Sequence, residues 1–105
     1  MAQFDVHANA DPGSRARMPY LVDVQSDLLG DLASRVVVPL VRADDSVLRP
    51  LARLTPVFEL EGREFVFVTP ELAGVSRSVL GRKVASLASR RHEIVAAFDM
   101  LISGV

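Results

Sequence analysis

Two histidines are the side chains of this chain best suited to proton transfer or metal binding at neutral pH. His7 and His92 lie near opposite ends of the sequence, and neither belongs to an HxH, HxxxH or HxxE pattern. Their spacing therefore does not favour a metal site. The serines lie in no GxSxG nucleophile elbow, and there is no glycine-rich phosphate loop. We predict surface positions for both histidines, no catalytic residue, no metal and no cofactor.

Acidic pairs offer a second route to acid–base chemistry, because two close carboxylates hold their protons at different pKa values. Asp23 with Asp27 and Asp44 with Asp45 are the candidate pairs. Carboxylates at such polar positions are ordinarily solvated. We expect both pairs to be solvated rather than catalytic.

A basic cluster precedes and enters the C-terminal segment; its members are Arg77, Arg82, Lys83, Arg90 and Arg91. Such a cluster can receive phosphate or an acidic partner. It is not interleaved with aromatic residues, so stacking with nucleic-acid bases has no support. A solvated face is the expected arrangement.

Composition narrows the class of protein. The 105 residues carry a formal net charge of −1, half of them are hydrophobic, and there is no cysteine. These values indicate one globular domain over residues 1–105 and exclude disulfides and cysteine-ligated metals. A near-neutral chain has no overall field that attracts nucleic acid or an anionic membrane. Because no apolar run has the length of a signal-peptide core or a membrane span, we expect a soluble cytoplasmic protein.

Short strands separated by turns are predicted for most of the chain. The strand-like segments are residues 3–7, 20–26, 35–41, 57–60 and 65–68, with a last short strand within 72–80 and a turn near Gly81. Gly62 predicts a tight hairpin with positive φ, and Pro39 predicts an edge or a bulge. Residues 9–17 and 30–34 are predicted loops, whereas Val47, Leu48, Leu51 and Leu54 within residues 42–53 fit either a helical turn or a loop.

The last stretch, residues 86–105, is predicted to be an amphipathic α-helix. Its apolar residues form two rows at helical spacing, namely Leu87, Ile94, Phe98 and Leu101, then Ala88, Val95 and Ile102. Ser86 or Ser89 is expected to cap the start, and Gly104 suits the exit. Because chain ends are usually polar, the apolar end indicates either packing or a contact with a partner.

Strands followed by one helix predict an α+β fold that is mainly antiparallel β. Five or six short strands suit a small, partly open barrel of the SH3-like kind with one C-terminal α-helix. An apolar helix face wider than one small core needs also favours pairing with a second copy of the chain.

Several short motifs occur in a fixed order along the chain. They are Phe-Asp-Val at 4–6, Leu-Val-Asp-Val-Gln-Ser-Asp-Leu-Leu at 21–29, Arg35, Val-Pro-Leu at 38–40, Pro-Val at 56–57, Ser-Val-Leu-Gly at 78–81, Val-Ala at 84–85, Leu87 and Gly-Val at 104–105. With these motifs the sequence resembles the CcdB toxin family, apart from a longer loop at residues 9–17. The Val-Asp-Val-Gln-Ser-Asp stretch is the most specific of them.

This resemblance implies a homodimer with a CcdB-like barrel and the toxin role in a toxin–antitoxin system. Such toxins are not enzymes; they bind the A subunit of DNA gyrase and trap the enzyme on cleaved DNA. A partly disordered antitoxin removes the toxin, and the pair represses its own promoter, so operator DNA is bound only through the antitoxin complex. The associated role is plasmid maintenance.

The family's gyrase contact lies at the end of the helix and at an early apolar pair. Carried over to this sequence, it comprises Leu28, Leu29, Asp99, Ile102, Ser103, Gly104 and Val105. We further predict that Arg90 and Arg91 bind the antitoxin, because an acidic disordered segment can order on a basic surface.

Two positions depart from the family's pattern. Ser103 stands where the gyrase poisons carry a Trp, and Asp99 stands where they carry an Asn. Losing a Trp anchor costs roughly 2–4 kcal/mol, or about 30- to 900-fold in affinity, and Asp99 adds a charge that docking must pair or desolvate. Alternatives therefore stay open: a different gyrase or another topoisomerase as target, an endoribonuclease on the same barrel using His7 or His92 with an Arg, or a degenerate toxin that only binds antitoxin.

Overall fold

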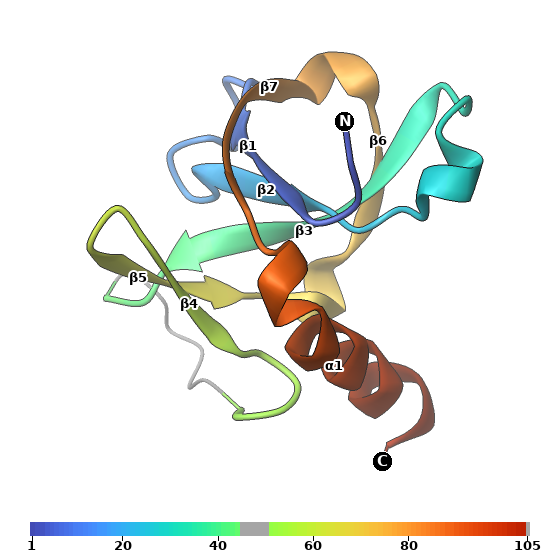
Figure 1. Cartoon of the computed structure of the whole chain (residues 1–105). Coiled ribbons are helices and arrows are strands. Elements are labelled where there is room, and N and C mark those ends of the chain that lie inside the picture. Colours follow the sequence, from blue (N-terminus) through green and yellow to red (C-terminus); the bar gives the residue numbers. More distant parts are fainter. Residues whose placement is uncertain (45–50, 105) are drawn as a thin grey trace.

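The strands of the chain form one antiparallel sheet that curls around a C-terminal helix (Figure 1). The structure is a computed structural model, and it describes residues 1–44 and 51–104. The strands are β1 (Asp5–Asn9), β2 (Tyr20–Asp23), β3 (Ser34–Arg42), β4 (Val57–Leu60), β5 (Arg63–Phe67), β6 (Ala73–Ser76) and β7 (Leu80–Ser86), followed by the helix α1 (Arg91–Ser103). Short 3₁₀ turns are η1 (Asp27–Leu29), η2 (Thr69–Glu71), η3 (Arg77–Val79) and η4 (Ala88–Arg90).

The strand order is β4-β5-β3-β2-β1-β7, and β6 also pairs with β3. β3 is the longest strand. It pairs with β2 along one edge, while its other edge pairs with β6 near the start of β3 and with β5 near the end of β3. No pairing joins β4 to β7, so the sheet curls without closing. The predicted α+β class, the antiparallel pairing and the partly open barrel are confirmed.

Pro39 lies inside the central strand rather than at an edge of the sheet, because β2 pairs on one side of β3. Within a strand, the N and O atoms of one residue face the same neighbour. The Pro39 carbonyl accepts from the Val68 amide at 3.1 Å, so the missing proline N–H faces the gap between β6 and β5. A central strand tolerates this proline because no ladder partner is lost there.

The main core lies between the inner face of the sheet and α1. It contains Val6, Val22, Val38, Leu40, Phe58, Phe65, Phe67, Leu87, Ile94 and Ala97, with Phe98 packed against it. The Phe58–Phe67 and Phe67–Phe98 ring pairs meet edge to face, a favoured aromatic geometry. The inner stripe of the helix therefore shares one core with the phenylalanines of β4 and β5.

The helix is shorter and less buried than predicted. It begins at Arg91, after the separate turn η4, and the Ser86 hydroxyl accepts from the Ala88 amide at 3.2 Å instead of capping α1. The second apolar row lies beside the buried stripe rather than within the core, because Val95 is 39% and Ile102 82% exposed. Gly104 ends the helix as predicted, with φ of +76° and its amide donating to the Met100 carbonyl.

The β4–β5 hairpin is confirmed, with Glu61 at φ +52° and Gly62 at φ +80°. Both central residues have positive φ, as in a type I′ turn. The turn predicted near Gly81 is wrong, because Gly81 lies within β7. This position requires a glycine, because a Cβ atom on residue 81 would lie 2.8 Å from the Ala8 carbonyl oxygen of the neighbouring strand β1. The expectations for Val47 and Leu48 lie outside the described residues. Leu51 is exposed, and Leu54 is half-buried in a turn before β4.

Within the described part of the chain, no helix combines the length and the apolar character needed to span a bilayer.

Candidate protein-contact site

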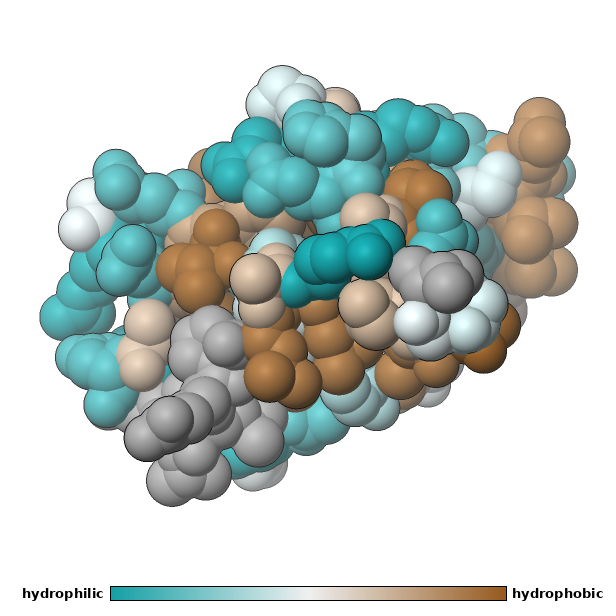
Figure 2. All heavy atoms as spheres, turned by 90° about the horizontal axis from the view of Figure 1, so that it is seen from below, coloured by the Kyte–Doolittle hydropathy of each residue, from teal (hydrophilic) through white to brown (hydrophobic). Residues whose placement is uncertain are grey.

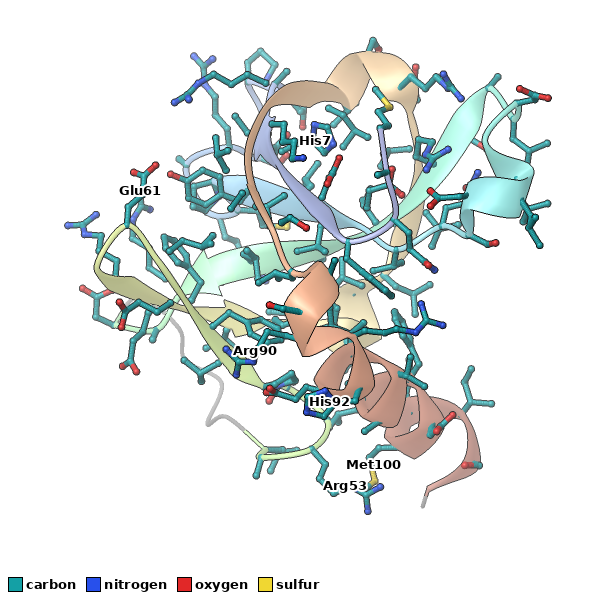
Figure 3. All side chains as sticks on the ribbon, viewed as in Figure 1. His7, Arg53, Glu61, Arg90, His92 and Met100 are labelled. Atoms are coloured by element: carbon teal, nitrogen blue, oxygen red, sulfur yellow. The ribbon has the colours of Figure 1, made fainter. Side chains whose placement is uncertain are left out.

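The two histidines lie in unlike surroundings and far apart (Figure 3). His7 is 4% exposed in β1, and its Nδ1 lies 3.0 Å from the Gly81 carbonyl oxygen. The predicted surface position is therefore wrong for His7, because β1 is an interior strand flanked by β2 and β7. His92 is exposed on α1, as predicted. The structure does not bring these two rings into one site.

Asp23 and Asp27 have separate partners rather than one shared site. Asp23 was expected to be solvated, but it is fully buried and pairs with buried Arg35, whose Nη2 lies 2.7 Å and Nε 2.9 Å from Asp23 Oδ2. Asp27 instead accepts from the Gln3 amide at 2.8 Å. Asp44 is exposed, and Asp45 lies outside the described residues. In residues 1–44 and 51–104, no three acidic or histidine side chains are grouped to hold a metal ion.

The basic cluster is spread over η3, β7, η4 and α1, and most of its members already have partners. Arg90 donates two hydrogen bonds to Glu93 and lies over the Phe58 ring at 5.0 Å. Arg91 donates to Gln3 Oε1 at 3.2 Å and lies over the Phe4 ring. Hydrogen bonding to Arg90 lowers the pKa of the Glu93 carboxyl, with the positive charge adding to the effect. The positive charge of Arg90 is thus balanced by the Glu93 carboxylate. Arg91 instead bonds to a neutral side chain, so its surface charge is not balanced in this way.

A small pH effect on stability follows from the Arg90–Glu93 pair. A carboxyl whose pKa is lowered by folding stabilises the fold above its unfolded-state pKa, and the contribution is lost as the pH falls through the folded-state pKa. Glu93→Gln is expected to cost less than about 1 kcal/mol at pH 7, because the pair is partly exposed. Urea unfolding at pH 7 and at a pH below both pKa values should show this cost disappear in acid. Glu64→Gln, at an exposed site on β5, is the control; an equal cost at both pH values would contradict the expectation.

The early apolar pair lies on the surface. Leu28 is 94% and Leu29 50% exposed in η1, and the nearby Leu32 is also 50% exposed. The Ser26 hydroxyl caps η1 by accepting from the Leu28 amide at 3.2 Å. Large aliphatic side chains this exposed, and this close in sequence, are typical of a protein-contact patch. Neither Leu28 nor Leu29 belongs to the core.

The end of α1 forms a second exposed patch. Ile102 is 82% exposed, and Asp99, Ser103 and Gly104 are exposed beside it. The Ser103 hydroxyl is occupied, since it donates to the Asp99 carbonyl at 2.7 Å. Val105 lies outside the described residues. Among its described residues, the predicted contact therefore retains one large apolar side chain here, Ile102.

The two patches are separate in a single chain. Figure 1 places η1, which follows β2, well away from the C-terminal end of α1. An apolar hollow of about 340 Å³ also lies beside α1, lined by Leu51, Ala52, Arg53, Leu54 and Met100. Figure 2 shows apolar surface interrupted by polar groups on this underside. A partner that contacts both patches must span the molecule or meet them on two copies of the chain.

The sequence did not indicate that Leu32 and Arg77 belong to the surface around η1, Leu32 as an exposed apolar side chain and Arg77 through its contacts with the loop. Leu32 lies in a predicted turn that has no periodicity. Arg77 donates to backbone carbonyls at Gly30 and Leu32, 47 and 45 positions away. Such contacts leave no side-chain pattern, so no signal in the sequence indicates them.

Comparison with protein families gives a match over nearly the whole chain. A family described as CcdB protein matches residues 3–104. The match includes both exposed patches, the buried Asp23–Arg35 pair and the whole of the sheet. The chain therefore belongs to the CcdB family, the toxins of toxin–antitoxin systems.

Proposed function

We propose that this chain acts by protein–protein contact, binding the A subunit of DNA gyrase and trapping the cleaved DNA complex without chemistry of its own. The observation that carries the proposal is the pair of exposed apolar patches, Leu28 at 94% and Ile102 at 82% exposure, in a member of the CcdB family. Burying a Leu or Ile side chain at an interface stabilises it by about 1.5–3 kcal/mol. The residues of the proposed contact are Leu28, Leu29, Asp99, Ile102, Ser103, Gly104 and Val105.

Ser103 and Asp99 shape the strength of this contact. With Ser103 in place of an aromatic anchor, Ile102 and the η1 leucines must supply most of the apolar burial. Asp99 requires a cation on the partner, because an unpaired charge at an interface is costly to desolvate. We therefore expect the target to be the host's own gyrase, with a basic residue facing Asp99.

Direct binding tests the proposal. Purified chain should bind the isolated A subunit of the host's gyrase in titration calorimetry, and should not bind the B subunit. Failure to bind the A subunit would contradict the proposal, and antitoxin binding without A-subunit binding would indicate a degenerate toxin instead.

We propose further that the chain works as a cytoplasmic homodimer that a disordered antitoxin neutralises, and that the complex represses its own operon and serves plasmid maintenance. A second copy would place another η1 patch and another α1 end within reach of one partner. The exposed apolar residues Leu51, Leu72 and Val95, which lie outside the proposed gyrase contact, are candidates for burial in such an assembly.

Arg91 is the better candidate of the two proposed antitoxin-binding arginines. Arg91→Glu is expected to weaken antitoxin binding by up to about fivefold, because an exposed ion pair contributes roughly 0.2–1 kcal/mol. Arg90→Glu should also lower the stability of the fold, because it removes the ion pair with Glu93. The thermal unfolding of this variant must therefore be measured beside its affinity. Arg82→Glu, on exposed β7 surface, is the matched control in a salt-dependent binding assay. Unchanged affinity for Arg91→Glu would exclude an antitoxin contact at this residue.

A further inference from the structure

We infer that Arg77 is a positioning residue for the η1 contact: it holds residues 30–32 in the conformation that presents Leu28, Leu29 and Leu32 to a protein partner. The inference rests on the proposed function, and the role that it gives Arg77 is to hold the loop rather than to supply a contact. Arg77 belongs to η3, an element remote in sequence from the loop that it holds.

The guanidinium of Arg77 bridges two backbone carbonyls of this loop. Its Nε donates to the Leu32 carbonyl at 3.1 Å, and its Nη2 donates to the Gly30 carbonyl. The guanidinium plane fixes the directions of both donors, so the two acceptors are held at one relative spacing. A lysine carries a single point charge on a flexible stem and cannot hold both carbonyls in this way.

The sheet brings Arg77 to this place. β6 pairs with the start of β3, with Ser76 opposite Ser34. The residue that follows β6 therefore lies beside the segment that enters β3. The Ser76 hydroxyl also faces the Ser78 amide and hydroxyl, which shapes the turn that carries Arg77. The position of this arginine is thus set by strand register rather than by the loop.

Side chains supply the rest of the loop's restraint. Gln25 Nε2 donates to the Leu29 carbonyl at 2.8 Å, while its Oε1 accepts from the Val36 amide at 3.1 Å. Asp27 Oδ1 accepts from the Gln3 amide. The loop has no strand pairing of its own, so these contacts and those of Arg77 fix its backbone from both sides.

A fixed loop matters because packing in the core does not hold the three exposed leucines in place. Their exposure of 94%, 50% and 50% leaves them without a core to hold them. A partner that bound a mobile loop would bear the cost of ordering its backbone on association. Arg77 removes part of that cost before the partner arrives, so its loss should lower affinity without removing any contacting side chain.

The test compares Arg77→Ala and Arg77→Lys with the control Arg82→Ala, in the full chain. Two quantities are measured: amide hydrogen exchange over residues 27–33 and over β3, and the affinity for the A subunit of host gyrase. Both Arg77 variants should speed exchange in the loop, leave β3 protected and weaken binding roughly tenfold, the loss expected for releasing about one residue of backbone. Arg82→Ala should change neither quantity.

The outcomes separate the inference from the proposed function. Unchanged loop exchange in Arg77→Ala would overturn the inference, and so would faster exchange with unchanged affinity. Full rescue by Arg77→Lys would also overturn it, because charge alone would then suffice. If the unaltered chain does not bind the A subunit, the proposed function fails and the inference falls with it. If the unaltered chain binds and the Arg77 variants bind equally well, the inference alone is refuted.

Discussion

Arg35→Leu is expected to lower the free energy of unfolding by about 3–5 kcal/mol, the usual cost of leaving a buried charge without its partner. Arg35 and Asp23 have side chains only 1% and 0% exposed, and Arg35 Nη2 lies 2.7 Å from Asp23 Oδ2. After the substitution, Asp23 keeps the Gln25 amide as a hydrogen-bond donor but loses its cation. Urea unfolding followed by circular dichroism measures the change.

The exposed Arg17–Glu71 pair supplies a matched control. Its N–O distance is 2.9 Å, but its side chains are 59% and 37% exposed, so Arg17→Leu should cost less than about 1 kcal/mol. The double variant Asp23→Leu with Arg35→Leu should recover much of the loss, because apolar replacements of a whole buried pair are often neutral. Equal costs for Arg35→Leu and Arg17→Leu would show that burial does not govern the energetics of this pair.

Leu28→Asp is expected to weaken binding to the gyrase A subunit by about 30-fold or more, the effect of losing an interface hot spot. Ile102→Asp should have an effect of the same order at the other patch. Both side chains are more than four-fifths exposed, so neither change removes core packing. Biolayer interferometry gives the affinities, and thermal unfolding checks that the fold is intact.

Conservative variants serve as controls for both patches. Leu28→Met and Ile102→Leu keep an apolar side chain of similar volume, so they should bind within about threefold of the unaltered chain. Loss of binding in Ile102→Asp alone would restrict the contact to the end of α1. Unchanged binding in both aspartate variants would remove these patches from the proposed contact.

Local chemistry made much of the fold predictable. Gly62 between two aromatic-rich segments indicated the β4–β5 hairpin, and positive φ at Gly62 confirms the reason. The β-branched run of residues 35–41 indicated the long buried strand β3. Each of these features depends on residues close together in sequence.

Long-range pairing was not predictable in the same way. β7 was missed because Arg82 and Lys83 are exposed on it, and because Gly81 suggested a turn where the sheet instead needs a residue without a side chain. Asp23 looked solvated because its partner Arg35 lies on the next strand. Asp23 is opposite Val37 in the register, which places Arg35 diagonally across from it on the same face.

The candidate site was predictable only in part. Helical spacing placed Ile102 on the same broad apolar face as Ile94, but it did not show that α1 buries only the narrow stripe of Ile94 and Ala97 completely. Leu28 and Leu29 lie in a 3₁₀ turn, too short for periodicity to indicate which face is buried. Their role as contacts comes from resemblance to the CcdB family and stays a prediction.

The most direct test is a cleavage assay with the host's gyrase, supercoiled plasmid, ATP and increasing amounts of the purified chain. The result we predict is linear DNA that accumulates with dose, that antitoxin suppresses, and that the double variant Leu28→Asp with Ile102→Asp does not produce. Absence of linear DNA at concentrations that saturate binding to the A subunit would show an inhibitor that does not trap cleaved DNA. Absence of both linear DNA and A-subunit binding would contradict the proposed function outright.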